Sequence, residues 1–79
     1  MIFKKKRLKN KLLIKTTFGD YSFEVDYEKG DDLILPWREF YQWYMNELKS
    51  DRYVFEYDTG LLYLERDLVR SFIIEVIKR

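Results

Sequence analysis

Three acidic side chains occur at alternate positions of one short segment. They are Glu24, Asp26 and Glu28, and they are interleaved with Val25 and Tyr27. Residues at this spacing point to the same face of an extended strand. Carboxylates that lie together in this way can serve as a general acid and a general base. The same alternation is typical of the solvated face of a half-buried strand. Because no substrate-positioning motif accompanies it, we expect no enzymatic activity.

Most other catalytic and metal-binding residue types are missing from the chain. Its 79 residues contain no Cys and no His, which removes thiol nucleophiles, disulfides, imidazole bases and the usual zinc ligands. Asp26, Glu28, Asp31 and Asp32 do not have the spacing of an EF-hand calcium loop. The three glycines stand too far apart for a phosphate-binding loop. The sequence therefore predicts no catalytic residue, no cofactor and no metal ion.

A basic N-terminal arm over residues 1–11 is the strongest electrostatic feature. It contains six cations and no acid: Lys4, Lys5, Lys6, Arg7, Lys9 and Lys11. These side chains could contact phosphates and give salt-dependent binding of nucleic acid. The favoured interpretation is a solvated terminal tail that aids solubility or pairs with the acidic remainder. The whole chain has a net charge of only +1, which excludes a wholly basic nucleic-acid coat.

The ordered part of the chain is expected to start with a β-hairpin over residues 12–27. Residues 12–18 are rich in apolar and β-branched types, and Gly19-Asp20 supply a turn. Residues 21–27 then alternate strictly between aromatic or apolar and polar side chains. This period of two predicts a strand with one solvated face.

An amphipathic helix is predicted from Trp37 to about Ser50. Asp32 is a candidate N-cap, and Pro36 is compatible with a first helical turn. The aromatic and apolar positions recur at i, i+3, i+4, i+7 and i+11, and they are Trp37, Phe40, Tyr41, Tyr44 and Leu48. Trp43 and Met45 fall outside this stripe, so we expect them at its boundary or in an exposed apolar patch.

A second hairpin is predicted over residues 52–65, with its turn at Asp58-Thr59-Gly60. The spacing in residues 68–78 fits either a helix or a strand, and the many β-branched residues there favour a strand. The order is therefore β-β-α-β-β-β. We expect a single α+β domain over residues 12–79, in which one aromatic-faced helix packs across an antiparallel sheet of four to five strands.

This pattern resembles the small ββαββ proteins that phages and prophages of low-GC bacteria encode. The resemblance covers roughly residues 12–77. It rests on the hairpin around Gly19-Asp20, the aromatic helix that starts at Trp37, and the closing hairpin around Gly60. It implies an accessory or inhibitory role, and it carries over no functional residues.

The leading functional hypothesis is a non-enzymatic protein-binding module that inhibits or redirects a host protein. Its expected contact residues are Trp43 and Met45 on the helix with the acids Glu24, Asp26, Glu28, Asp31 and Asp32. A nucleic-acid-binding protein and a structural subunit are the alternatives. A homodimer could form through an edge strand or exposed aromatic rings. No apolar run approaches the ~20 residues of a membrane span, so we expect no membrane partner and a cytoplasmic location.

Overall fold

The computed structural model describes residues 8–45, 50–57 and 59–78 of the chain. The strands are β1 (Leu8–Thr16), β2 (Gly19–Tyr27), β3 (Arg52–Tyr57), β4 (Gly60–Glu65) and β5 (Val69–Lys78), and the helix is α1 (Arg38–Tyr44). Single 3-10 turns precede α1 at Leu35–Trp37 and β5 at Arg66–Leu68. This confirms the α+β class and the predicted order of elements. Within these described ranges, no helix is long and apolar enough to cross a membrane.

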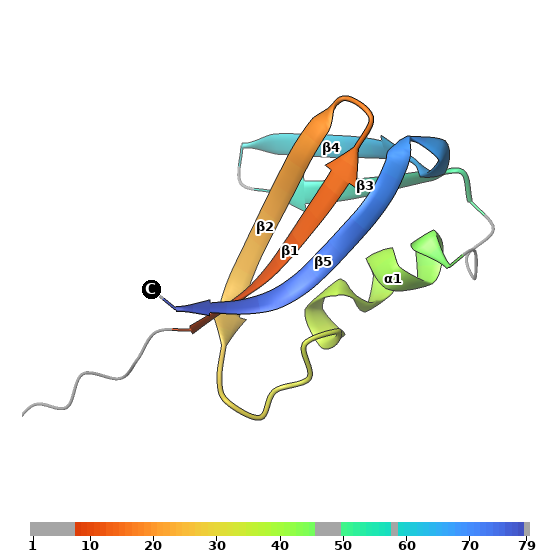
Figure 1. Cartoon of the computed structure of the whole chain (residues 1–79). Coiled ribbons are helices and arrows are strands. Elements are labelled where there is room, and N and C mark those ends of the chain that lie inside the picture. The colour runs from red at the N-terminus through yellow and green to blue at the C-terminus, as the bar shows by residue number, and fades with distance from the viewer. Residues whose placement is uncertain (1–7, 46–49, 58, 79) are drawn as a thin grey trace, which may run out of the picture.

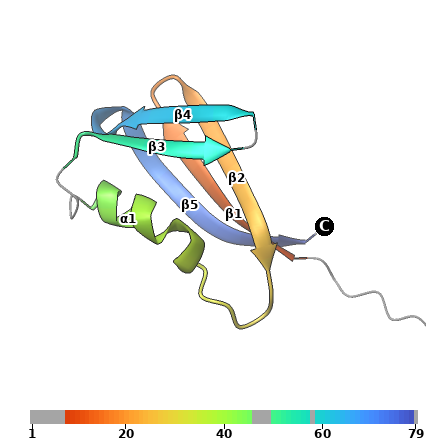
Figure 2. The same cartoon turned by 180° about the vertical axis from the view of Figure 1, so that it is seen from behind.

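The strands form two antiparallel sheets, so the expectation of one sheet of four to five strands is wrong. One sheet has the order β2-β1-β5, and β3 pairs with β4 in the other. The β3-β4 hairpin crosses one face of the larger sheet (Figures 1 and 2). Phe23 of β2 stacks on Phe55 of β3, with ring centroids 4.4 Å apart. Stacking the two sheets buries aromatic faces that one short helix could not cover.

The central strand of the larger sheet is β1, which begins at Leu8, earlier than the predicted strand. Leu8 lies opposite Tyr27 of β2 on one side and Lys78 of β5 on the other. The final segment therefore forms a strand, as its composition predicts, because β1 pairs with it along its length. Alternate β1 residues face the core, and they are Asn10, Leu12 and Ile14.

The helix lies on the same side of the larger sheet as the hairpin (Figure 2). Its described part ends at Tyr44, and the predicted continuation at residues 46–49 lies outside the described residues. Asp32 does not cap α1. Its Oδ1 atom instead accepts a hydrogen bond from the backbone N–H of Ile34, at 3.0 Å. Pro36 occupies the first 3-10 turn, where its missing N–H leaves no acceptor unsatisfied.

The position of Trp43 differs from the one predicted from the aromatic stripe of the helix. Trp43 is 1% exposed, whereas its position outside the aromatic stripe predicted a boundary or exposed site. Its ring lies 5.7 Å from Phe40 and 5.5 Å from Tyr53, between centroids. The hairpin supplies Tyr53 and so covers a side of α1 that a single sheet would leave open. The remaining buried apolar side chains are Leu12, Ile14, Trp37, Phe40, Leu64 and Val69.

Candidate functional site

The acids of β2 and the cations of β1 form one mixed surface. Lys9 lies opposite Asp26 and Lys11 opposite Glu24 in the β1-β2 register. The Lys9 ammonium donates a hydrogen bond to Asp26 Oδ1. Because these residues alternate with the buried positions of β1, they lie on the opposite face of the sheet. The hairpin and α1 cover the face of the buried positions, and Figure 1 shows them on one side of the larger sheet. The sequence suggested protein binding for the acids and nucleic-acid binding for the lysines, and the structure places these two sets opposite each other.

The other predicted contact residues lie elsewhere. Glu28, Asp31 and Asp32 belong to the connection between β2 and α1, where Asp31 Oδ2 accepts a hydrogen bond from the Glu28 backbone N–H at 3.1 Å. Met45 follows the last residue of α1 and is 54% exposed. Lys4, Lys5, Lys6 and Arg7 lie outside the described residues. The predicted protein-binding residues are therefore dispersed over the molecule, and Trp43 is buried.

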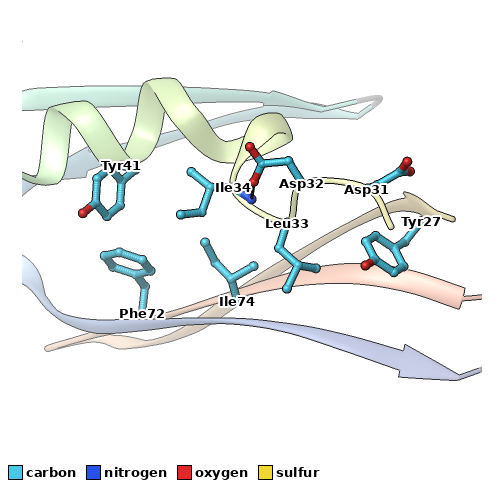
Figure 3. A pocket seen from close by; sticks show the side chains of 8 residues that line it. All are labelled: Tyr27, Asp31, Asp32, Leu33, Ile34, Tyr41, Phe72 and Ile74. Carbon is cyan, nitrogen blue, oxygen red and sulfur yellow. Dashed lines mark hydrogen bonds between the residues drawn. The ribbon is translucent and has the colours of Figure 1, made fainter. Parts of the chain in front are cut away.

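Asp31 and Asp32 do line a groove of about 510 Å³ between the β2-α1 connection, α1 and β5. The other lining residues are Tyr27, Leu33, Ile34, Tyr41, Phe72 and Ile74. Figure 3 shows Tyr41 and Ile34 on one wall, opposite Phe72 and Ile74 on the other. None of these six residues was singled out as a site residue from the sequence. Their only signal was ordinary apolar patterning, which does not reveal which faces stay uncovered.

A buried asparagine fixes one wall of this groove. The Asn10 side-chain nitrogen donates a hydrogen bond to the Leu33 carbonyl at 2.8 Å, and the Trp37 indole N–H donates to the Asn10 side-chain oxygen at 2.9 Å. Asn10 thereby ties the connection to the central strand. Arg38 adds an ion pair with Asp32 at 3.8 Å. Because these contacts act on the half of the connection next to α1, they hold Leu33 and Ile34 in place in the groove wall.

The groove combines apolar walls with a strand edge. Ile34 is 40% exposed although it belongs to one wall. Phe72 and Ile74 lie on the same face of β5, and Val76 continues that face with an exposed side chain. Among the described strands, β5 pairs with β1 alone. Its other edge thus offers backbone groups to a further strand.

Arg66 makes structural contacts at the C-terminal end of α1, away from the groove, and does not form a binding site there. Arg66 donates hydrogen bonds to the Trp43 carbonyl, at 3.1 Å, and to the Ser50 carbonyl. Its guanidinium carbon also lies 5.5 Å from the centre of the Trp43 ring. A cation at the C-terminus of a helix is stabilising because carbonyls there lack intrahelical donors. Arg66 therefore joins the end of α1 to the turn before β5.

The chain was compared with protein-family models, with curated proteins and with solved structures. None of the three comparisons gives a match. The resemblance to phage and prophage proteins thus stays a prediction, and only the geometry of the described surfaces supports a function.

Proposed function

We propose that the chain is a small non-enzymatic protein-binding module and that the groove between α1, the β2-α1 connection and β5 is its binding surface. The observation that carries this proposal is the exposure of apolar side chains in a groove beside an edge of β5 with which no other described strand pairs. Apolar side chains that lose water on binding supply affinity. Backbone groups of a strand edge supply hydrogen bonds to an extended partner. A polypeptide can use both features, whereas a compact small molecule would use the groove alone.

An accessory protein of a phage could inhibit or redirect a host protein through such a surface by covering one of its segments. This role predicts that the bound protein is bacterial and that its activity changes on binding. Identification of the partner therefore tests the role, while the groove variants described next test the surface.

The test is retention of protein from a nuclease-treated bacterial lysate on the immobilised chain. Ile34→Asp places a charge on the exposed wall of the groove and should abolish retention. Tyr63→Asp introduces the same charge on β4 at an exposed position outside the groove and should leave retention unchanged. Circular dichroism of both variants checks that they are folded. The expected result is one stoichiometric protein, identified by mass spectrometry, that only Ile34→Asp fails to hold.

Two results would contradict the proposal. Equal retention by wild type and Ile34→Asp would place the binding surface elsewhere. Material that is retained from an untreated lysate but not from the nuclease-treated lysate would instead favour the nucleic-acid alternative.

A further inference from the structure

The groove is not uniform along its length. Figure 3 shows Tyr41 and Phe72 at one end, Ile34 and Ile74 next to them, and Asp31 with Tyr27 at the other end. Tyr41 and Phe72 contact each other edge to face, with ring centroids 6.3 Å apart. The groove thus changes from an apolar end to an acidic end.

The register of the larger sheet aligns this change with β5. Phe72 lies opposite Ile14 of β1, and Lys78 lies opposite Leu8, whose other neighbour is Tyr27. The apolar end therefore corresponds to the first half of β5 and the acidic end to its last residues. From the apolar end toward the acidic end, the β5 residues on the groove face are Phe72, Ile74 and Val76. They stand two residues apart, the spacing that places side chains on one face of a strand.

The two carboxylates at the acidic end differ in their partners. Asp32 pairs with Arg38 at 3.8 Å. Asp31 accepts a backbone hydrogen bond from Glu28 and has no ion-pair partner among the described residues. Both residues are exposed. Asp31 is therefore the carboxylate whose charge a bound cation can balance.

On the premise of the proposed function, we propose that the groove binds an extended peptide that adds to β5 as an antiparallel strand. An antiparallel partner matches the pairing of β5 with β1 and is the slightly more stable arrangement. Its N-terminal part then lies beside the acidic end of the groove and its C-terminal part beside Phe72. The recognised peptide carries Lys or Arg near Asp31, followed at the fourth and sixth positions after it by apolar side chains that enter the groove beside Ile74 and Phe72.

The test is selection of a displayed library of random nonapeptides on the full chain. The expected consensus is a basic residue with apolar residues four and six positions after it. Selection on Asp31→Lys should replace the basic residue by an acidic one and keep the apolar pair. Asp20→Lys, an exposed substitution at the far end of β2, is the matched control and should keep the basic residue.

A synthetic peptide of the consensus sequence gives a quantitative readout by fluorescence anisotropy. Asp31→Asn should weaken binding about twofold to fivefold, as expected for loss of an exposed ion pair, and Asp20→Asn should leave the affinity unchanged. Methylation of the peptide backbone nitrogens one at a time should weaken binding at alternate positions, because alternate N–H groups of an edge strand face its neighbour.

Three outcomes would overturn this inference. They are a consensus without a basic residue or with the apolar pair before it, a consensus that Asp31→Lys does not alter, and the absence of any enriched sequence. Insensitivity to nitrogen methylation would overturn the strand addition itself. If Ile34→Asp still abolishes capture of a lysate protein in these cases, the protein-binding module stands and only the class of peptide is wrong.

Discussion

The indole N–H of Trp37 donates a hydrogen bond to the side-chain oxygen of Asn10, 2.9 Å away. Asn10 is 1% exposed, and its amide nitrogen also donates to the Leu33 carbonyl. One buried side chain therefore links the central strand to the start of α1 and to the connection that forms a wall of the groove. Stability and the shape of the groove depend on the same contact.

Asn10→Leu should lower the free energy of unfolding by about 2 to 3 kcal/mol, because it leaves the buried Trp37 N–H and the partly buried Leu33 carbonyl without these partners. Urea unfolding followed by tryptophan fluorescence measures this loss. Trp37→Phe removes the indole donor from the same pair. The double variant should lose less than the sum of the two single losses, and strict additivity would show that the two side chains do not act together.

Phe40→Ala should lower the free energy of unfolding by roughly 3 to 5 kcal/mol. Phe40 is fully buried and contacts rings from both sheets, including Phe55 and Phe72, at centroid distances of 5.4 and 5.2 Å. Phe18→Ala, in the exposed β1-β2 turn, is the control and should change stability by no more than about 0.5 kcal/mol. A Phe40→Ala loss below about 1 kcal/mol would contradict the packing of α1 against the larger sheet and the β3-β4 hairpin.

Arg66→Met keeps much of the side-chain volume but removes the hydrogen bonds to the Trp43 and Ser50 carbonyls. We expect it to lower the free energy of unfolding by about 1.5 to 3 kcal/mol, the range for hydrogen bonds of charged groups. Arg66→Lys should restore only part of this loss, because an ammonium cannot reproduce the planar arrangement of donors over the Trp43 ring. Chemical denaturation compares the variants, and full rescue by lysine would mean that charge alone matters.

Stability should decline at alkaline pH through Tyr53. Burial raises the pKa of the Tyr53 phenol above its ordinary value of 10.0, and the negative charge of Glu39 raises it further. The folded state thus holds this proton more tightly than the unfolded state does. The associated stability is fully present below pH 10.0 and is lost as the pH rises through the folded-state pKa. Urea unfolding of wild type and Tyr53→Phe at about pH 9 and about pH 11 checks this. The variant should lose less stability between the two values, and equal losses would contradict the assignment.

Lys9 and Lys11 should contribute little to nucleic-acid binding, because Asp26 and Glu24 lie opposite them. Replacing both lysines by Gln should leave the affinity for a labelled oligonucleotide nearly unchanged, as measured by fluorescence anisotropy at about 150 mM salt. The Lys9-Asp26 pair is partly solvated, with side-chain exposures of 29% and 92%, so Asp26→Asn should cost no more than about 1 kcal/mol of stability. A large loss of oligonucleotide affinity in the lysine variant would support the nucleic-acid alternative.

Local patterns predicted the elements of this fold well. Strict alternation marked β2, the turn residues around Gly19 and Gly60 located both hairpins, and β-branched composition favoured a strand for residues 68–78 over a helix. These signals depend on backbone preferences and on periodicity within one segment. They say little about which segments pair, and for that reason the single sheet was wrong while the order of elements was right.

For the candidate site, the difference between what local sequence patterns predict and what the tertiary structure decides is larger. The sequence by itself determined the aromatic core positions Trp37 and Phe40, the absence of Cys and His, and the acidic character of residues 28–32. Only the tertiary structure decided that Trp43 is buried, that Lys9 and Lys11 face acids, and that Ile34, Tyr41 and Phe72 meet in one groove. The burial of Trp43 depends on how the β3-β4 hairpin crosses the larger sheet. That crossing is set by contacts such as Phe23 with Phe55, which lie far apart in the chain and leave no local period to detect.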